Sequence, residues 1–316
     1  YIHVPVCRYR CDYCDFFTRI HVAPTRQHDL IRRISAQADT LIDFTTSTPL
    51  ATVYVGGGTP SALDPDGWDE LLHLISRLIS RPDTRNNAVV PEVTVELNPE
   101  DITKTRCFEL RDAGVNRLSV GVQTFSPGAL QAIGRHTGAQ ETVRGLNTLA
   151  ENWDAQWSAD LIVAIPGASS ELVRRDIRTL LDFQPRHISV YELSIEPTTV
   201  LGHASRRGRI HSTTETEALL QLHVAAELLQ DAGYRRYEIS SYAYPGSESR
   251  HNLAYWRMAP HLGLGPGAVG TFPLSGDKLP ETPQRPSTSL LPATDIHRVT
   301  NTRSFADFLG QDDFGM

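Results

Sequence analysis

The sequence is poor in cysteine, in net positive charge and in long apolar runs, and each shortage excludes a class of protein. Only four of the 316 residues are cysteine, too few for a secreted fold held by disulfides, so we expect a cytoplasmic protein. The formal net charge of −7 argues against binding nucleic acid, which calls for a basic face. No run approaches the ~18 apolar residues of a membrane-spanning helix, so only peripheral membrane association stays open.

Short β-rich runs alternate with longer helical patterns through the first two thirds of the chain. The runs with strand character are Tyr1–Val6, Thr52–Val55, Glu92–Leu97, Arg117–Val122, Asp160–Ile165 and His187–Leu193. The helical patterns between them are Gln27–Phe44, Gly67–Arg81, Thr103–Ala113, Thr142–Glu151 and Leu172–Phe183. This alternation predicts an α/β fold with a parallel sheet, either open or rolled towards a barrel.

The chain beyond residue 212 has a different pattern. We expect a helix at Thr214–Ala232, because Thr214 and Glu217 have the spacing of a capping box, and then a strand at Tyr234–Ile239. Residues 273–294 are rich in Pro, Ser and Thr and predict a loop or a partly disordered insert, followed by a short amphipathic piece at Ser304–Leu309. We therefore predict a core domain over residues 1–212 and a C-terminal helix–strand region over residues 213–316.

Three of the four cysteines lie within eight residues, directly after the first predicted strand. Cys7, Cys11 and Cys14 form a C-x3-C-x2-C run, and thiolates prefer soft metal centres such as zinc and iron–sulfur clusters. A four-iron cluster held by three thiolates keeps one iron open for another ligand. The alternative is a zinc-stabilised α/β protein, with His3 or His21 as the fourth zinc ligand.

Polar and glycine-rich motifs follow the predicted strands. They are Gly56-Gly57-Gly58-Thr59-Pro60-Ser61, Glu96-Leu97-Asn98-Pro99, Gly121-Val122-Gln123, a predicted helix carrying Gly134-Arg135-His136, and Asp160-Leu161-Ile162 at the start of the fifth strand. Ligands of parallel βα proteins bind at the carboxyl ends of the strands. The glycine run lacks the Gly-Lys-Ser/Thr ending of a phosphate-binding loop, so these motifs predict a ligand site of another kind.

Taken in order, these motifs resemble the radical S-adenosylmethionine (SAM) superfamily. The match extends to Asn116-Arg-Leu-Ser-Val-Gly-Val-Gln-Thr-Phe, Ile188-Ser-Val-Tyr-Glu-Leu and His251-Asn-Leu-Ala-Tyr-Trp, and it spans most of residues 1–270. Within the superfamily, the chain is similar to the oxygen-independent coproporphyrinogen III oxidase-like family. The resemblance implies a partial (β/α)6 radical SAM barrel with a C-terminal extension.

The resemblance also implies the cofactors and their ligands. Cys7, Cys11 and Cys14 would ligate a [4Fe–4S] cluster. The residues that would bind SAM are Tyr13, Gly57, Gly58, Thr59, Glu96, Gln123, Arg135 and Asp160, and Tyr1 and Ser194 match positions near the cofactors. This set suits SAM, whose ammonium, sulfonium, carboxylate and hydroxyl groups need both acidic and basic partners.

Two features separate two branches of this family. Coproporphyrinogen oxidases carry a fourth cysteine two residues after the third, and here that place is taken by Phe16. Phe16 and the motif of residues 251–256 resemble the haem chaperone (HemW) branch instead. That resemblance implies a protein that binds haem and delivers it to client proteins; the alternative is decarboxylation of coproporphyrinogen III by an oxidase.

The same motif would hold the haem. The residues that the resemblance places there are His251, Asn252, Tyr255 and Trp256, with Arg250 or Arg257 as the partner of a haem propionate. Imidazole is a good axial ligand for haem iron. Because Pro245 and Gly246 interrupt the preceding residues, we predict that Tyr242–Arg250 is a surface loop that holds the motif near the mouth of the barrel.

Overall fold

The computed structural model describes residues 1–45, 50–80, 90–273 and 296–310. Its centre is a sheet of six parallel strands in chain order, with two antiparallel strands added beyond the sixth. The parallel strands are β1 (Ile2–Val4), β2 (Thr52–Gly57), β3 (Glu92–Leu97), β4 (Arg117–Gln123), β5 (Gln156–Val163) and β6 (His187–Glu192). The antiparallel strands are β8 (Ser241–Ala243) and then β7 (Arg235–Arg236). The predicted α/β class and its parallel sheet are confirmed.

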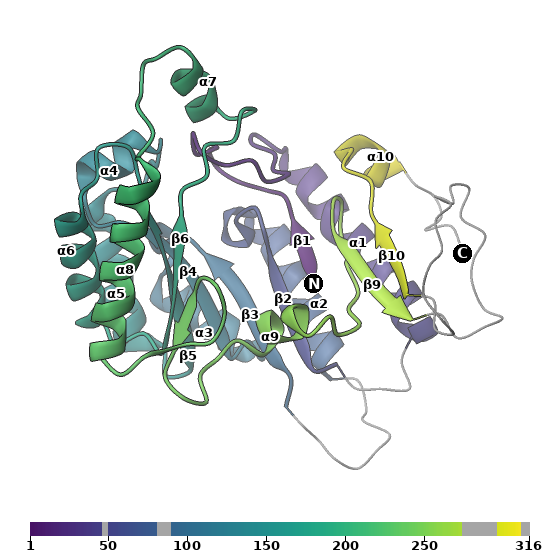
Figure 1. Cartoon of the computed structure of the whole chain (residues 1–316). Helices are drawn as coiled ribbons and strands as arrows, with labels where there is room; N and C mark the ends of the chain where they lie inside the picture. Colours follow the sequence, from purple (N-terminus) through teal and green to yellow (C-terminus); the bar gives the residue numbers. More distant parts are fainter. Residues whose placement is uncertain (46–49, 81–89, 274–295, 311–316) are drawn as a thin grey trace.

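Helices cover the outer face of this sheet, as Figure 1 shows. They are α1 (Pro24–Thr45), α2 (Pro65–Ile79), α3 (Lys104–Asp112), α5 (Ala139–Asn152), α6 (Ser170–Leu181) and α8 (Glu215–Asp231). In α2, the buried Trp68, Leu71, Ile75 and Leu78 recur at helical spacing and face the core. Asp64 caps this helix by accepting from the backbone N of Gly67 at 2.8 Å.

The sheet is rolled but its strand order does not close. Among the described residues, β1 and β7 are the two ends of that order. The free edge of β1 is covered from outside the sheet by Leu264, which accepts from His3 N and donates to Tyr1 O, both at 2.8 Å. The expected partial barrel is therefore what the chain forms.

Two predictions around the strand ends are wrong in detail. β5 begins at Gln156, four residues before the predicted start, so Asp160 lies in the middle of this strand. Gly134, Arg135 and His136 lie in the turn after the short helix α4 (Pro127–Ala132), not in a helix. Gly134 has φ +64, a left-handed conformation that ends a helix and favours glycine.

The region after residue 212 packs on the same sheet. The capping box of Thr214 and Glu217 is confirmed at the start of α8. The predicted strand Tyr234–Ile239 is confirmed only at Arg235–Arg236, which form β7, and the next strand, β8, begins at Ser241. The predicted surface loop Tyr242–Arg250 is also wrong at its start, since Tyr242 is buried in β8.

Shorter elements complete the described chain. They are η1 (Pro60–Ala62), η2 (Pro99–Asp101), α7 (Val200–Arg206), α9 (Arg250–Trp256), the hairpin of β9 (Val269–Pro273) and β10 (Ile296–Thr300), and α10 (Phe305–Gly310). The amphipathic piece near the end is confirmed as α10, whose Phe308 is buried. Apart from Pro273, the predicted insert lies outside the described residues. None of the helices in the described ranges is both long and apolar enough to cross a membrane.

Candidate functional site

The three-cysteine loop lies beyond the carboxyl end of β1 and is held by backbone hydrogen bonds at Cys7 and at Asp12. Cys7 N donates to Arg19 O at 2.9 Å. Further along, Asp12 N donates to Ile133 O at 3.1 Å, and Leu201 N, on α7, donates to Asp12 O at 2.9 Å. These backbone bonds hold the loop over the strand ends on the side of α7 (Figure 1).

Each cysteine of the loop contacts the barrel or another cysteine. Cys7 Sγ lies 3.7 Å from Thr59 Oγ1, Cys11 Sγ lies 3.7 Å from Arg135 Nη1, and Cys14 N donates to Cys11 O at 3.1 Å. Burial raises the pKa of the Cys7 thiol to about 11 and also raises that of Cys14. A bound metal favours the thiolate, so this donor set suits a cationic, sulfur-preferring centre.

A site for a single metal ion, such as zinc, would need its ligands closer together than the cysteine loop holds them. Within the described ranges, no three His, Cys, Asp or Glu side chains are grouped to hold a single metal ion. A cubane instead binds each thiolate to a separate iron, so its ligands are spread out. Of the two candidate zinc ligands, His3 uses both ring nitrogens, Nδ1 with Tyr1 Oη at 2.9 Å and Nε2 with Phe17 O at 3.0 Å, and His21 is exposed.

Glu96 is the acidic centre of the barrel interior. Tyr54 Oη donates to its Oε1 at 2.8 Å and Gly57 N donates to its Oε2 at 3.1 Å. Burial, with a smaller contribution from the nearby Asp160, raises the pKa of Glu96 to about 7. Gly57 has φ +106, and a Cβ there would lie 2.4 Å from the His3 ring, so only glycine fits at this position.

The glycine run presents backbone to the same space. Gly58 N donates to Val4 O at 3.0 Å and Thr59 N donates to Val6 O at 2.7 Å, while Gly57 N is used by Glu96. All three N–H groups are therefore engaged within the protein. If Gly57, Gly58 and Thr59 bind the ammonium of SAM, they would do so through carbonyl oxygens, because an ammonium needs acceptors.

Arg135 links the cysteine loop to the strand ends. Its Nη2 donates to Asn98 Oδ1 at 2.7 Å and to Gly121 O at 2.9 Å, while Nη1 faces Cys11. Gln123 ends β4 with φ +68 after a bulge in the pairing with β5, a conformation that turns the chain at the site. Asn98 is absent from the predicted site residues, although it stands in the Glu96–Pro99 motif.

Asp160 and Tyr13 lie near this polar group. Ser119 Oγ donates to Asp160 Oδ2 at 3.1 Å, and burial raises the pKa of Asp160 despite hydrogen bonds from Ser189 and Ser119. Tyr13 packs against the apolar cluster that contains Ile133 and Ile162. Ser119 and Ser189 were not predicted, because nothing in a lone strand serine marks which neighbouring strand it faces.

Two further predicted residues lie at opposite ends of the sheet. Ser194 follows β6, is exposed, and makes no hydrogen bond to the other predicted residues that the structure describes. Tyr1 lies at the amino end of the sheet, where its ring centroid is 6.2 Å from that of Tyr54. The structure thus gathers the cysteines, Thr59, Glu96, Gln123, Arg135 and Asp160 toward the carboxyl ends and places Tyr1 near the motif of residues 251–256.

That motif lies on helix α9, at the amino end of β2. His251 Nδ1 is 3.0 Å from Thr52 Oγ1, and its ring stacks on Tyr54 at 4.7 Å and meets the edge of Tyr255 at 4.8 Å. His251 Nε2 is buried without a hydrogen-bond partner in the described chain, and burial lowers the pKa of His251 to about 3. The imidazole is therefore held neutral, the form that binds metals.

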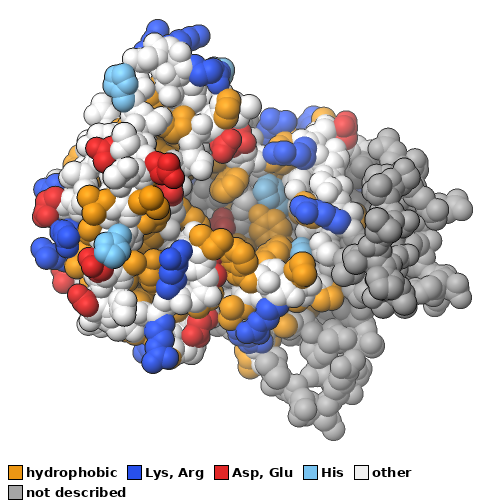
Figure 2. All heavy atoms as spheres, viewed as in Figure 1, with side chains coloured by type: hydrophobic (Ala, Val, Ile, Leu, Met, Phe, Trp, Pro, Cys, Tyr) orange, Lys and Arg blue, Asp and Glu red, His pale blue; other side chains and the backbone are white. Residues whose placement is uncertain are grey.

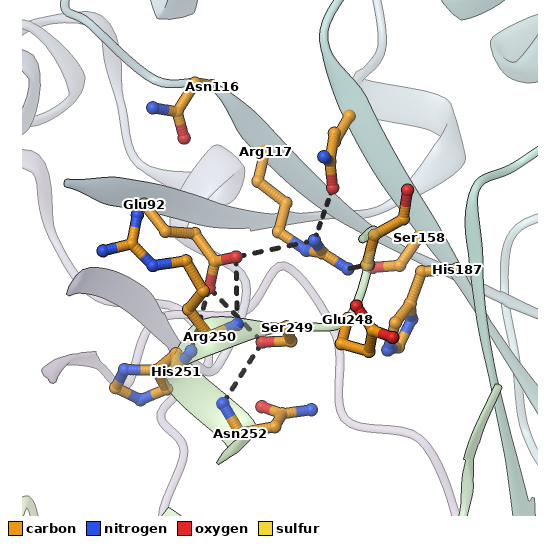
Figure 3. Close-up of polar contacts among 12 residues, drawn as sticks. Glu92, Asn116, Arg117, Ser158, His187, Glu248, Ser249, Arg250, His251 and Asn252 are labelled. Carbon is orange, nitrogen blue, oxygen red and sulfur yellow. Dashed lines mark hydrogen bonds and ion pairs between the residues drawn. The ribbon is translucent and has the colours of Figure 1, made fainter. Parts of the chain in front are cut away.

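Glu92 holds the start of α9 against the sheet, as Figure 3 shows. Its carboxylate accepts from Arg250 N at 3.0 Å and from His251 N at 2.9 Å, which are unpaired donors of the helix N-terminus. Arg117 lies 3.5 Å from Glu92 and also donates to Ser247 O at 3.1 Å. Sequence patterns gave no sign of this buried ion pair, which orients His251.

Of the rest of the motif, Tyr255 and Trp256 are exposed, whereas the Asn252 side chain is half-buried and bonds Tyr237. Asn252 N donates to Ser249 Oγ at 3.2 Å, and Tyr255 and Trp256 are 40% and 54% exposed. Arg250 Nη1 donates to Val90 O at 3.0 Å, and Arg257 is exposed. Residues 250–256 are helical and lie at the opposite end of β2 from the cysteine loop (Figure 1), which corrects the predicted place near the mouth.

The sequence was compared with protein families and with known proteins. The model of the radical SAM superfamily matches residues 1–180. The haem chaperone HemW of Escherichia coli (strain K12) is 34% identical over 277 residues, which are 86% of this chain and 70% of that protein. HemW of Bacillus subtilis (strain 168) is 32% identical over 270 residues, 85% of this chain and 70% of that protein.

The fold likeness extends to a solved structure of a related protein. The coproporphyrinogen III oxidase of Escherichia coli (HemN) superposes with a TM-score of 0.71 at 20% identity, over 86% of this chain and 65% of that one. At that identity the likeness shows the shared fold. The superfamily model and the HemW relatives show that the chain belongs to the radical SAM superfamily and, within it, to the HemW family.

Proposed function

We propose that this protein is a haem chaperone that carries a [4Fe–4S] cluster and SAM, binds haem and passes it to client proteins. The proposal rests on its likeness to two proteins named haem chaperone HemW. The observation that carries it in the structure is Tyr54, whose ring stacks on His251 while its hydroxyl donates to Glu96. One side chain thus joins the expected SAM pocket to the expected haem motif.

The described residues fit the two cofactors. Cys7, Cys11 and Cys14 would hold the cluster, which supplies electron transfer and an open iron for the amino-acid part of SAM. Arg135, at the cysteine loop, offers a charged donor for a carboxylate, and Asp160 offers an acceptor for hydroxyl groups. Tyr13, packed on Ile133 and Ile162, provides an apolar surface for the adenine.

Loss of the charged side chains should weaken SAM binding without removing the cluster. Arg135→Gln and Asp160→Asn are each expected to lower SAM affinity by roughly 10- to 150-fold, the value of one charge-assisted hydrogen bond of about 1.5–3 kcal/mol. The measurement is anaerobic calorimetry of SAM binding, with iron and sulfide content determined on the same samples. Arg144→Gln is the control, because Arg144 is an exposed arginine of α5. Unchanged affinity in both site variants would place the pocket elsewhere.

Haem binding and porphyrinogen decarboxylation are distinguished by paired assays. Addition of haem to the anaerobically purified chain should give a shifted Soret band, because an imidazole or another side chain ligates the iron. The same preparation, supplied with SAM and reductant, should leave coproporphyrinogen III unchanged. Decarboxylation without any Soret shift would contradict the chaperone proposal and favour the oxidase.

A further inference from the structure

A hollow opens beside the haem motif, between the amino end of β1, helix α9 and the β9–β10 hairpin. Its volume is about 310 Å³, and its walls include Tyr1, His3, Tyr255, His261 and Arg298. Figure 2 shows histidine and apolar side chains gathered near the centre of this face, with Lys and Arg side chains around them. Apolar and aromatic walls with a few polar groups are typical of small-molecule sites.

The three histidines in and beside this hollow differ in their free nitrogens. His3 has both nitrogens engaged, by Tyr1 and by Phe17. His251 has its Nδ1 at Thr52 and its Nε2 sealed inside the protein. His261 also lines the hollow but, unlike buried His3 and His251, it is only half-buried, and one of its nitrogens has no partner in the described chain.

The tautomer of His261 follows from its one hydrogen bond. Nδ1 lies 3.1 Å from Ala259 O, and a carbonyl only accepts, so Nδ1 carries the proton and Nε2 keeps a lone pair. Nε2 has no hydrogen-bond partner among the described residues. A backbone carbonyl on the other ring nitrogen is the arrangement that orients a metal-ligating histidine.

The remaining walls suit a flat, acidic molecule. The Tyr255 ring meets the His261 ring edge-on at 4.5 Å, and Tyr255 also contacts His251, so the motif braces His261 from one side. Arg298 is exposed and pairs with Thr271 across the β9–β10 hairpin. A guanidinium binds carboxylates in two parallel hydrogen bonds, and a haem propionate is such a carboxylate.

We propose that this hollow is the haem pocket, with His261 Nε2 as the axial ligand of the iron and Arg298 as the partner of a propionate. The inference rests on the proposed haem-chaperone function and makes it more specific, because it moves the ligand role from His251 to His261. His251 then packs against Tyr255, which in turn contacts the His261 ring and holds it in place. A half-buried ligand at an open hollow can be exchanged for a client's own ligand, whereas a sealed one cannot.

The axial ligand is tested by haem titration of the anaerobically purified full chain, followed by difference spectra in the Soret region. His261→Gly is expected to lose the imidazole-type Soret band and to bind haem at least about 10-fold more weakly. Added imidazole should restore the band, which it would not do if the histidine were merely structural. His223→Gly, on the exposed side of α8, is the control and should bind haem as the wild type does.

The propionate contact is tested with a second ligand. Arg298→Leu should weaken haem binding about 10-fold, the value of one charge-assisted hydrogen bond, and keep the Soret shape. Haem dimethyl ester, which lacks free carboxylates, should bind Arg298→Leu and wild type equally. An equal loss for both ligands would overturn the propionate assignment.

The outcomes separate this inference from the proposed function. A wild type without any Soret change would contradict haem binding altogether. A wild type that binds haem, with a spectrum that His261→Gly leaves intact, would overturn the inference and leave the chaperone proposal standing. Loss of the band in His251→Ala but not in His261→Gly would return the ligand role to His251.

Discussion

Alanine at Cys7, Cys11 or Cys14 is expected to abolish the iron–sulfur absorbance of the anaerobically purified protein and the EPR signal of its reduced form. Three thiolates are the fewest that hold a four-iron cluster in this loop, so each one is required. The loop should also lose protection from proteolysis, because ligand binding and local folding are coupled. Iron and acid-labile sulfide analysis measures the loss directly.

The fourth cysteine provides the matched control. Cys107 is buried in α3 at 1% exposure, so Cys107→Ala is expected to cost some stability through a small cavity and to keep the full cluster. A variant that lacks Cys7, Cys11 and Cys14 together yet retains iron and sulfide would contradict the assignment. Zinc in place of iron in the wild type would favour the structural-metal alternative.

Removal of Arg117 is expected to destabilise the fold by about 3–5 kcal/mol, the cost of leaving a buried charge without its partner. Glu92 and Arg117 are 8% and 2% exposed, and the pair joins β3, β4 and the start of α9. In Arg117→Met the Glu92 carboxylate would stay buried without a cation. Urea unfolding of the holo protein should show a lower midpoint urea concentration for the variant than for the wild type. Circular dichroism without urea checks that the variant is folded.

A control and a double variant make this prediction specific. Arg235→Met, at an exposed arginine of β7, should change stability by less than about 0.5 kcal/mol. Glu92→Met combined with Arg117→Met should lose less than the sum of the two single losses, because no lone charge is left behind. Additive losses would show that the two side chains act independently.

The location of the expected SAM residues was predictable, because βα alternation places the ends of successive parallel strands at one edge of the sheet. Thr59, Glu96 and Gln123 follow directly from that rule. Asp160 was predicted at the start of the fifth strand, whereas it lies inside β5, where the alternation of side chains along the strand makes it face inward. Asp160 was therefore predicted as a site residue from its motif, and the error in the strand boundary did not affect that prediction.

Residues whose role depends on distant partners could not be found in this way. Tyr54 reaches Glu96 only through the β2–β3 register, which pairs Val55 with Val95. His251 meets Thr52 across 199 residues of sequence, and Glu92 caps α9 across 158 and 159 residues. Sequence patterns report local periodicity, and such contacts are fixed by how the sheet rolls and by what packs across its amino end.

During synthesis, β1 is made long before Leu264, the residue that covers its free edge. Leu264 bonds to the free edge of β1 at His3 and Tyr1, and Gln37 of α1 bonds to Asn301, which is 264 residues later. At roughly 5–20 residues per second, these partners leave the ribosome roughly 10–50 s after β1 and α1. The cysteine loop lies between β1 and α1, so until then its anchoring strand has one open edge. We expect the nascent chain to depend on protection of this edge from mispairing until Leu264 emerges.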